Sequence, residues 1–534
     1  MAQETHPPKA PRPKGERKKQ LIQKGKHGLW RVIFSRTGII VLLLLMQIAL
    51  LLTLYLRFRQ YMVHYFSVSG VLTAVMVLWL MNSEGEPSAK STWLILFLLF
   101  PLAGSLFYFY CRLDIGHRAL RDRCRQINRD AARTMTQGPA FRALEEESPA
   151  DAGLAAYLFE AGSFPVYDKT AVQYYPSGED FFPALLDELE RAERFIFLEY
   201  FIIEPGIMWD KVLEVLCRKA DQGVNVRVLY DGTCEFFRVP RGYWKTLEEK
   251  NVRCRVFAPI HPFVSTHYNY RDHRKIAIVD GRIAFTGGVN MADEYINETH
   301  PFGQWKDTAL RLEGEGVRSF TLLFLEMWHV SERGELKLEP WLSASTPCAA
   351  PTSGYVIPYG DNPLDDEPVG EWVYTHILSQ AKHYVHIMTP YLILDSELEN
   401  ALRFAARRGV EVSIILPHTP DKRIPFALAK THLPRLTAAG VKVYEYLPGF
   451  IHAKSFVSDG CRAVVGTINL DYRSLYHHFE CAAFLYGEEK AGPVEADFQR
   501  TLADCQRITR DGAARPGLGW KLLGTLMKII APMM

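Results

Sequence analysis

A five-residue pattern that occurs twice in this chain of 534 residues constrains its fold more than any other feature. In each copy the order is histidine, one residue, lysine, four residues, aspartate, six residues, glycine, two residues and asparagine. The first copy consists of His273, Lys275, Asp280, Gly287 and Asn290, and the second consists of His452, Lys454, Asp459, Gly466 and Asn469. A repeat about 180 residues long predicts two copies of one structural unit.

Each copy of the pattern predicts a β-hairpin. Residues 276–279 are apolar and mostly β-branched, and they end at an Asp-Gly pair, which is a hairpin signal between two such runs. The strand that enters the turn carries His273 and Lys275, and residues 283–286 form the strand that leaves it. Because residues two apart on a strand share a face, the histidine and the lysine point the same way. We expect the glycines after the second strand to let a charged ligand approach the backbone.

The residue types of the pattern suit a phosphate group. Lysine neutralises its charge, the asparagine amide donates hydrogen bonds, and histidine either attacks phosphorus or transfers a proton. Displacement through a covalent intermediate needs a nucleophile and a separate acid for the leaving group. A single histidine beside a surface lysine would more often be structural, but two complete copies that face each other favour a catalytic site.

The doubled pattern resembles the HKD signature of the phospholipase D superfamily. Three further segments resemble bacterial cardiolipin synthases: residues 303–308, 389–417 and 466–480. The resemblance runs from about residue 38 to the C-terminus. It implies an α/β fold of two similar phospholipase D-like lobes with pseudo-twofold symmetry, preceded by N-terminal transmembrane helices.

Alternating helical and strand patterns support two lobes of one design, each with a parallel-dominated sheet. The first lobe is predicted to contain helices at 179–194 and 208–220 and strands at 195–203 and 224–230. The second is predicted to contain helices at 371–381 and 397–407 and strands at 384–388 and 410–416. Ser396 and Glu399 have the spacing of a capping box that would start the helix at 397–407.

The domain boundaries follow from these patterns and from composition. They are 1–36 for a basic arm, 37–111 for a membrane region with two or three transmembrane helices, 112–153 for a charged helical connector, 154–333 for the first lobe, 334–351 for a linker, 352–515 for the second lobe and 516–534 for an apolar segment. The basic arm either contacts anionic lipid headgroups or only sets the topology. The apolar C-terminal segment either lies in the membrane interface or packs on the second lobe.

Three apolar segments precede the lobes. Residues 37–56 and 93–111 are long enough and apolar enough to span a bilayer, whereas residues 61–81 carry polar side chains and are a weaker candidate. Basic residues flank the region on both sides, which places both flanks in the cytoplasm and requires an even number of crossings. The number of crossings therefore stays open. We expect a multi-pass protein of the cell membrane with its catalytic lobes on the cytoplasmic side.

Charge and cysteine content exclude several classes of function. The net charge is +2, from 62 basic and 60 acidic residues, so that nothing in it favours a nucleic-acid partner. The nine cysteines are an odd number without a CxxC pair, which indicates reduced thiols rather than disulfides or a zinc site. We expect no metal site and no cofactor, since the two motif lysines already supply positive charge.

The roles of individual residues follow from the resemblance. The signature residues His273, Lys275, Asp280, His452, Lys454 and Asp459 form the catalytic set, and the predicted phosphate-binding residues are Asn290, Asn469, Gly287, Gly288 and Gly466. Asp307 and Glu480 are the candidates for the carboxylates that orient the histidines. The two signature aspartates lie at the hairpin turns, far from the histidines, and we expect them to act structurally.

The resemblance implies a membrane-bound phosphatidyltransferase that condenses two phosphatidylglycerol molecules into cardiolipin and glycerol through a phosphohistidine. Family precedent makes His273 the nucleophile and His452 the acid and base, although the residues themselves leave that order open. Its partners would be phosphatidylglycerol, other anionic phospholipids and the membrane. The alternatives are hydrolysis by water, transfer to another alcohol, a nuclease, which the apolar segments disfavour, and a silent lipid-binding scaffold, which two complete motifs disfavour.

Overall fold

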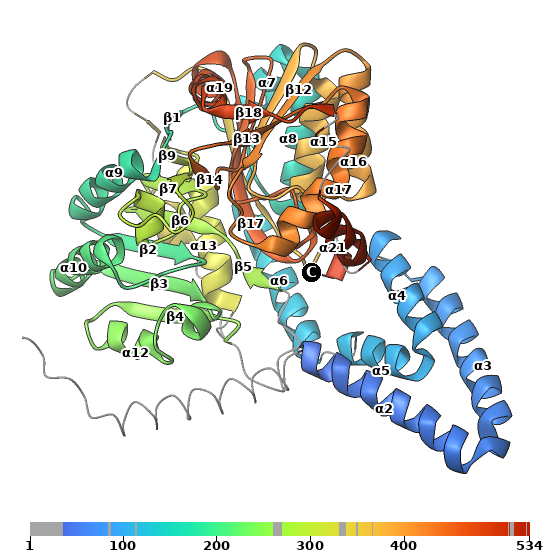
Figure 1. Cartoon of the computed structure of the whole chain (residues 1–534). Helices are drawn as coiled ribbons and strands as arrows, with labels where there is room; N and C mark the ends of the chain where they lie inside the picture. The colour runs from blue at the N-terminus through green and yellow to red at the C-terminus, as the bar shows by residue number, and fades with distance from the viewer. Residues whose placement is uncertain are drawn as a thin grey trace, which may run out of the picture. The chain divides into compact units, whose positions relative to one another are not determined.

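The computed structural model describes residues 36–83, 87–112, 115–259, 270–330, 338–345, 347–348, 351–365, 367–510, 512, 517–529 and 531–533 (Figure 1). Apart from residue 36, the predicted basic arm lies outside this range. The described residues up to 112 belong to one compact unit, and those from 115 onward belong to a second.

The first unit is entirely helical. Its elements are α2 (Arg36–Arg57), η1 (Arg59–Tyr61), α3 (Met62–Met81), α4 (Pro87–Leu99) and α5 (Pro101–Arg112). Among the described residues, one helical segment, Arg59–Met81, has both the length and the apolar composition to cross a membrane. Two shorter apolar segments accompany it, the part of α2 from Leu42 to Arg57 and the helix Pro87–Leu99. The segment that the sequence ranked as the weaker candidate therefore also has the length and composition of a span, beside α2, which is 22 residues long.

The single span predicted at 93–111 is wrong, because the chain breaks there into two short helices. Proline lacks the N–H that an unbroken helix needs, and it disfavours helical geometry in the residue before it, so α4 ends at Leu99 and α5 begins at Pro101. The two helices pack together, with ring centroids 5.4 Å apart for Phe97 and Tyr108. The buried Gln47 side chain accepts a hydrogen bond of 3.0 Å from the N–H of Ala103, which lies in the first turn of α5.

The first lobe of the second unit is built on a seven-stranded sheet with the order β1-β9-β7-β6-β2-β3-β4. The strands are β1 (Thr170–Tyr175), β2 (Phe195–Tyr200), β3 (Asn225–Asp231), β4 (Arg253–Phe257), β6 (Lys275–Val279), β7 (Ile283–Gly287) and β9 (Ala309–Gly314). The hairpin predicted from the first motif is β6–β7. Its strands pair antiparallel from Ile276 opposite Thr286 to Val279 opposite Ile283.

The second lobe repeats this order over seven strands and adds an eighth, β18, at one edge. Its sheet runs β10-β17-β16-β15-β11-β12-β13-β18, and the second motif forms the hairpin β15–β16. The strands are β10 (Tyr355–Asp361), β11 (Tyr384–Met388), β12 (Glu411–Pro417), β13 (Lys442–Tyr446), β15 (Ser455–Ser458), β16 (Arg462–Gly466), β17 (His478–Tyr486) and β18 (Cys505–Arg507). Two lobes with the same strand order confirm the predicted duplication.

The prediction of parallel-dominated sheets is wrong. In each lobe only three consecutive strands are parallel, β2-β3-β4 in the first and β11-β12-β13 in the second. The motif hairpin and the two strands beyond it extend each sheet with antiparallel neighbours. The helix and strand alternation revealed the parallel part, but it carries no signal for strands that join through hairpins.

The predicted helices of both lobes are present with small shifts at their ends. They are α9 (Gly178–Glu190), α10 (Ile207–Asp221), α15 (Val369–Gln380) and α16 (Ser396–Arg407). The capping-box prediction is displaced by one residue, because the N-cap of α16 is Asp395. Its carboxylate accepts a hydrogen bond of 2.8 Å from the N–H of Leu398.

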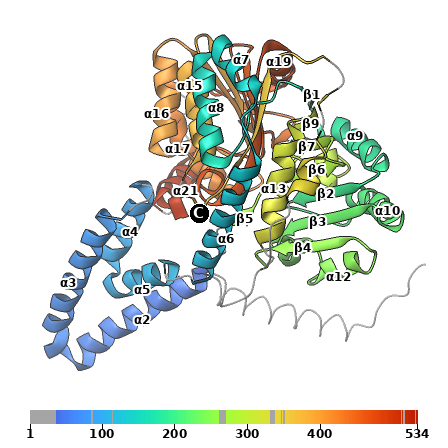
Figure 2. The same ribbon diagram turned by 180° about the vertical axis from the view of Figure 1, so that it is seen from behind.

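Further helices complete the second unit. They are α6 (Ile115–Thr134), α7 (Pro139–Glu147), α8 (Pro149–Gly162), α11 (Cys234–Phe237), α12 (Tyr243–Glu248), η2 (Asp293–Ile296), α13 (Val317–Val330), α14 (Glu339–Leu342), α17 (Arg423–Ala439), α18 (Tyr472–Tyr476), α19 (Glu488–Ala503), α21 (Leu518–Lys528) and η3 (Ala531–Met533). The predicted connector is therefore helical, as expected. Although α8 comes shortly before β1, the first strand of the first lobe, it packs beside α15 of the second lobe (Figure 2). Its buried Asp151 lies 2.8 Å from the guanidinium of Arg462.

Candidate active site

Two short parallel strand pairs bring the two motif histidines to the interface between the lobes. β5 (Arg271–Asp272) pairs with the start of β17, and β8 (Gln304–Lys306) pairs with β14 (Gly449–Ile451). Each motif histidine comes directly after one of these pairs. The N–H of His273 donates to the carbonyl of Phe479 at 2.9 Å, and the N–H of His452 donates to the carbonyl of Lys306 at 2.7 Å. The backbone of each histidine is therefore anchored to the opposite lobe.

The same cross-lobe pairing places a carboxylate against each imidazole. Nδ1 of His273 lies 2.9 and 3.0 Å from the two carboxylate oxygens of Glu480. Nδ1 of His452 lies 2.6 Å from Oδ2 of Asp307. Both acids are fully buried. The sequence identified these two acids as the orienting candidates, but it gave no indication that each would serve the histidine of the other lobe.

The two motif lysines come two residues after the histidines, Lys275 at the start of β6 and Lys454 directly before β15. Nζ of Lys275 donates to the carbonyl of His273 at 2.5 Å, and Nζ of Lys454 donates to the carbonyl of His452. Nζ of Lys454 also lies 2.8 Å from Nδ1 of His452. One ring nitrogen cannot donate to Asp307 and accept from Lys454 at the same time. We assign the Nδ1 proton to the contact with Asp307, because it is shorter and the acceptor is a carboxylate.

The electrostatics of the site keep both imidazoles neutral near pH 7. Burial and then the charge of Lys275 hold the pKa of His273 well below its ordinary value. Burial and then Lys454 lower the pKa of His452 to about 4, against the opposing effect of Asp307. With Nδ1–H donated to a carboxylate, Nε2 of each ring carries a free lone pair. The charge of Lys454 also lowers the pKa of His273, and that of Lys275 lowers the pKa of His452. Each half-site, meaning one motif histidine with its lysine and its orienting acid, therefore acts on the other.

The lysines and Glu480 are shifted as well. Burial lowers the pKa of Lys275 to about 8 and that of Lys454 to about 7. Burial raises the pKa of the Glu480 carboxyl well above its ordinary value, and Lys275 opposes this shift. All these directions follow from placing charges in a site with little access to water.

The asparagines and glycines of the motifs have close protein neighbours. The Asn290 amide donates to the hydroxyl of Tyr295 at 2.7 Å and accepts from the N–H of Ile202 at 3.0 Å. Oδ1 of the buried Asn469 has no hydrogen-bond partner among the described residues. The phosphate-binding role of both amides stays a prediction, with Asn469 the less constrained of the two.

Packing gives a reason for glycine at three motif positions. A Cβ atom at Gly288 would lie 1.9 Å from Oδ1 of Asp307, and one at Gly466 would lie 2.4 Å from the carbonyl oxygen of Cys481. At Gly287 the φ angle is +148° and a Cβ atom would lie 2.3 Å from the carbonyl oxygen of Thr308. These glycines admit the neighbouring strand and the orienting acid, and their predicted contact with phosphate stays a prediction.

The signature aspartates lie at the far ends of the hairpins, as expected. The Asp280 carboxylate accepts from the N–H groups of Glu193, Arg194 and Phe195 at 2.7 to 2.8 Å. The Asp459 carboxylate accepts from the N–H groups of three residues, 382–384, at 2.7 to 2.9 Å. Each aspartate adopts a positive φ angle, 54° and 52° respectively. They fasten each hairpin turn to the start of the neighbouring strand.

Replacing Asp459 with asparagine is expected to destabilise the second lobe by about 1–3 kcal/mol, because an amide cannot accept three backbone hydrogen bonds as a carboxylate does. Burial alone would raise the Asp459 pKa, but the backbone N–H groups lower it overall. Its stabilisation is therefore present above the pKa of the unfolded state and is lost as the pH falls. Thermal unfolding measures the effect. Asp504→Asn, at an exposed position, is the matched control, and equal melting temperatures for both variants would contradict this role.

Two aromatic neighbours of the histidines were not recognised in the sequence. The ring centroid of Trp305 lies 5.4 Å from that of His452, and the ring centroid of His478 lies 5.3 Å from that of His273. Each of these residues comes two positions before an orienting acid, on the strand that pairs across the lobes. The equivalent positions of the two half-sites thus hold different side chains.

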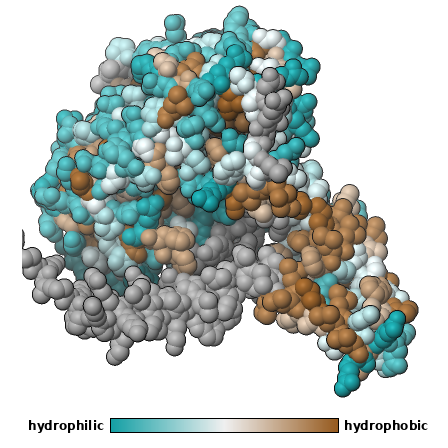
Figure 3. All heavy atoms as spheres, in the orientation of Figure 1, coloured by the Kyte–Doolittle hydropathy of each residue, from teal (hydrophilic) through white to brown (hydrophobic). Residues whose placement is uncertain are grey.

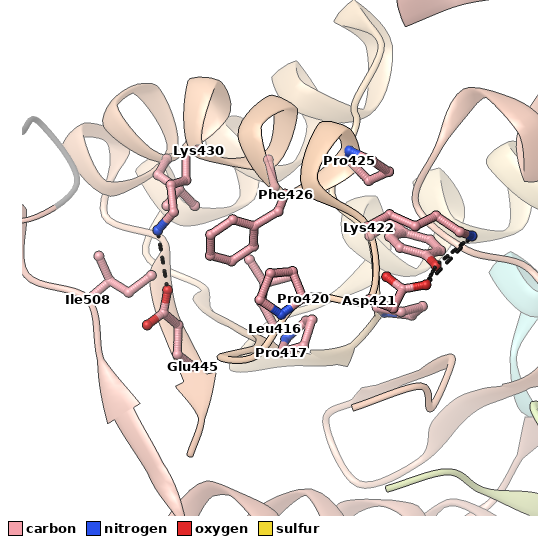
Figure 4. Close-up of a pocket in the computed structure, with 14 residues that line it drawn as sticks. Leu416, Pro417, Pro420, Asp421, Lys422, Pro425, Phe426, Lys430, Glu445 and Ile508 are labelled. Atoms are coloured by element: carbon pink, nitrogen blue, oxygen red, sulfur yellow. Dashed lines mark hydrogen bonds and ion pairs between the residues drawn. The ribbon is translucent and has the colours of Figure 1, made fainter. Parts of the chain in front are cut away.

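A pocket on the second lobe is separate from the histidines (Figure 4). It lies between α17 and the ends of β12 and β13, and Pro420, Pro425 and Phe426 form much of its apolar lining. The ion pair between Lys430 and Glu445, 3.5 Å apart, borders one side. None of the residues assigned to the active site lines this pocket. The motif histidines themselves are only 7% exposed.

A solved structure supports the architecture. The crystal structure of a phosphatidylserine synthase from Haemophilus influenzae superposes with a TM-score of 0.54 over 68% of this chain and 95% of that chain. The two sequences are 13% identical, so the similarity concerns the fold alone.

Sequence comparisons identify the family. A family model described as "Cardiolipin synthase, PLD-like domain" matches residues 185–302 and 374–502, one segment in each lobe. A cardiolipin synthase from Halalkalibacterium halodurans is 31% identical over 510 residues, which cover 94% of this chain and 100% of the relative. A cardiolipin synthase from Geobacillus sp. (strain WCH70) is 32% identical over 453 residues, covering 84% and 89%. An uncharacterized protein of Streptococcus mutans serotype c is 49% identical over 465 residues, covering 86% and 99%. With these relatives and a matched segment in each lobe, the chain belongs to the cardiolipin synthase family of phospholipase D-like proteins.

Proposed function

We propose that this protein condenses two phosphatidylglycerol molecules into cardiolipin and free glycerol through a phosphohistidine. The observation that carries the proposal is a pair of buried histidines, each held in its Nδ1–H tautomer by a carboxylate from the opposite lobe. A symmetric pair of this kind supplies one nucleophile and one acid and base. Relatives named cardiolipin synthase support cardiolipin as the product.

The reaction is a double displacement at phosphorus. Nε2 of the first histidine attacks the phosphodiester, and the bond from phosphorus to the glycerol oxygen breaks. When the anionic phosphodiester binds, its negative charge raises the pKa of the second histidine, whose Nε2 takes up a proton from solvent. This histidine gives that proton to the departing glycerol and then removes a proton from the hydroxyl of a second phosphatidylglycerol. That oxygen attacks phosphorus and releases the first histidine. Lys275 and Lys454 stabilise the negative charge that grows on the non-bridging oxygens.

Exclusion of water favours transfer over hydrolysis. The motif histidines are nearly buried, so a nucleophilic lipid hydroxyl that fills the opening would compete well with water. The test is to incubate the purified full-length protein with phosphatidylglycerol alone and to identify the products by mass spectrometry. Cardiolipin with an equal amount of glycerol is the expected result. Phosphatidic acid as the main product would mean that water is the acceptor, and the proposal would fail.

The lysines predict an alkaline limit to activity. Lys454, with a pKa of about 7, and Lys275, with a pKa of about 8, lose their positive charge as the pH rises through those values. The value of kcat/KM should therefore fall over this range, because kcat/KM reports the ionisations of the free enzyme. In Lys454→Arg, the guanidinium stays charged and the fall should move to higher pH, at a lower maximum. An unchanged profile in that variant would show that another group sets the limit.

The sequence left two alternatives open for the C-terminal segment, and the packing of helix α21 on the second lobe supports one of them while its exposed face is compatible with the other. One face packs on α17, where the Trp520 and Phe426 ring centroids are 5.3 Å apart. The other face leaves Leu522 and Leu526 exposed at 61% and 53%. Figure 3 shows hydrophobic side chains gathered at this position. We include in the proposal that this face, with Lys521 beside it, contacts the anionic bilayer that holds the substrate.

Replacing Leu522 and Leu526 together with serine is expected to lower kcat/KM toward phosphatidylglycerol in vesicles by about tenfold or more, because two leucines no longer insert into the interface. Activity toward short-chain phosphatidylglycerol dissolved in detergent should not change. Phe237→Ser, at another exposed apolar residue on the first lobe, serves as the control. Equal losses in vesicles and in detergent would indicate a folding defect and would contradict the membrane contact.

A further inference from the structure

A third histidine lies in the active site without a hydrogen-bond partner. His478 is 8% exposed, and neither of its ring nitrogens has a partner within the described part of the chain. Its ring lies beside those of His273 and Phe201, with centroid distances of 5.3 and 6.5 Å. Burying an imidazole without a hydrogen bond is unfavourable, so a buried, unpartnered imidazole in a reactive site indicates an absent ligand.

The surrounding atoms have the geometry of a metal site. Nδ1 of His478 lies 3.6 Å from Oε1 of Glu480, and Nδ1 of His273 lies 2.9 Å from the same oxygen. The three residues can direct one ligand atom each into a cluster no wider than 4.8 Å. A tetrahedral zinc ion with bonds of about 2.0–2.1 Å holds its ligand atoms about 3.3–3.4 Å apart. The two distances to Oε1 of Glu480, 2.9 and 3.6 Å, lie on either side of that value.

The second half-site lacks this arrangement. His452 and Asp307 correspond to His273 and Glu480, but the position that corresponds to His478 is occupied by Trp305. An indole offers no lone pair to a metal. Only one of the two half-sites therefore has three ligands, and the metal site is not a general consequence of the duplicated fold.

We propose that His273, His478 and Glu480 form a site for a borderline divalent cation, represented by Zn²⁺, and that its occupation reversibly blocks catalysis. Two imidazoles and one carboxylate are ligands that zinc accepts, with a fourth position left for water or a lipid phosphate. The binding claim stands independently of the reaction, whereas the blocking claim rests on the proposed function.

Blocking follows from the proton on the ring of His273. In the active form that proton is on Nδ1, and Nε2 carries the lone pair that attacks phosphorus or accepts a proton. A metal ion binds through a lone pair on Nδ1, so the proton must leave Nδ1 and the neutral ring carries it on Nε2 instead. Nε2 then has no lone pair, and the half-site cannot react. Removal of the ion by a chelator restores the original tautomer.

The nearby ammonium groups limit the affinity. The positive charges of Lys275 and Lys454 both lower the pKa of His273, so they lie close enough to repel a divalent cation bound there. The site should therefore bind more weakly than a structural zinc site and should release its ion to a chelator such as EDTA.

The experiment is a calorimetric titration of the full-length, detergent-solubilised and EDTA-treated protein with Zn²⁺. One equivalent should bind, and His478→Phe should weaken binding at least about 100-fold, since even groups behind a metal ligand cost ten- to hundredfold. Phenylalanine keeps an aromatic ring at this position and removes no hydrogen bond, because the His478 nitrogens make none to the described residues. His478→Asn is the second variant if the first does not fold. His418→Phe is the matched control, because His418 also lies beside a glutamate, 3.0 Å from Glu445, but is half exposed.

Activity is measured in parallel. Zn²⁺ should inhibit cardiolipin formation by the unmodified protein, EDTA should reverse the inhibition, and His478→Phe should be insensitive at the same concentration. Absence of zinc binding, or equal binding by the unmodified protein and both His478 variants, would overturn the site. Binding that depends on His478 without any inhibition would keep the site and reject its blocking role. Normal binding with no turnover of phosphatidylglycerol by the metal-free protein would instead contradict the proposed function.

Discussion

Alanine at His273 or at His452 is expected to lower kcat by at least about 1,000-fold, because one variant lacks the nucleophile and the other lacks the acid and base. Each motif imidazole contacts a carboxylate of the opposite lobe, and each has its own role in the proposed mechanism. Removing either side chain therefore leaves half of a two-part mechanism. Cardiolipin formation measured by mass spectrometry gives the rate.

The two variants should differ in the intermediate that they accumulate. The variant that keeps the nucleophile can still form the covalent bond to phosphorus with an activated substrate, and the phosphatidyl group then stays on the protein because the acceptor hydroxyl is not deprotonated. Intact-protein mass spectrometry would detect that adduct and assign the nucleophile. His418→Ala, at a half-exposed histidine outside the site, should retain normal activity. Substantial turnover by either motif variant would exclude the two-histidine mechanism.

Amide substitutions at the orienting acids have the second largest expected effect. Glu480→Gln and Asp307→Asn should each lower kcat by about 100- to 10,000-fold, because an amide N–H next to Nδ1 favours the tautomer with the proton on Nε2. Shape and volume barely change, so the fold should persist. In the proposed mechanism, Glu480→Gln affects the half-site of His273 although the two residues belong to different lobes.

A histidine and glutamate pair outside the site provides the matched control. Nδ1 of His386 lies 2.9 to 3.0 Å from the carboxylate of Glu495, in the same geometry as the pair in the site. Glu495→Gln should leave kcat unchanged. Nitrogen NMR of the labelled protein reports the tautomer directly, and it should shift to Nε2–H for His273 in Glu480→Gln. Normal activity in Glu480→Gln and Asp307→Asn would show that the carboxylates do not orient the histidines.

Local patterns in the sequence were sufficient for much of the fold. The hairpin at the first motif was predicted from an Asp-Gly pair between two apolar runs, and β6 and β7 lie within a residue or two of the predicted positions. The position of Asp280 at the turn also indicated its structural role, because a short acidic side chain at a tight turn usually binds backbone N–H groups. These features depend on neighbours in the chain, which the sequence displays directly.

Contacts between distant segments could not be predicted in the same way. The carboxylates were found as candidates by their positions after each motif, but the partner of each histidine depends on how β5 and β8 cross to the other lobe. No local pattern encodes that crossing. His478 was overlooked for a related reason, since only the folded lobes show that its ring lies beside His273 and that its nitrogens have no partner.

The prediction of membrane helices from hydropathy was limited in a different way. A hydropathy pattern counts apolar residues, and it merged α4 and α5 into one span because the intervening Pro101 changes hydropathy very little. The proline nevertheless ends the hydrogen-bonded helix, and length as well as composition decides whether a helix reaches across a bilayer. The candidate that the sequence ranked lower, at 61–81, lies within the apolar helical segment Arg59–Met81.

Because each motif histidine pairs with a carboxylate of the other lobe, the order in which the ribosome synthesises the two lobes matters. His273 is synthesised 207 residues before Glu480, so a nascent chain that has completed its first lobe still lacks the acid that sets the tautomer of that histidine. Domains generally fold as they emerge, with the N-terminal one first. In the proposed mechanism, a first lobe that folds before the second is synthesised would therefore carry a His273 that is not yet held in its reactive tautomer. By the same mechanism, truncated products that end before residue 480 would be inactive.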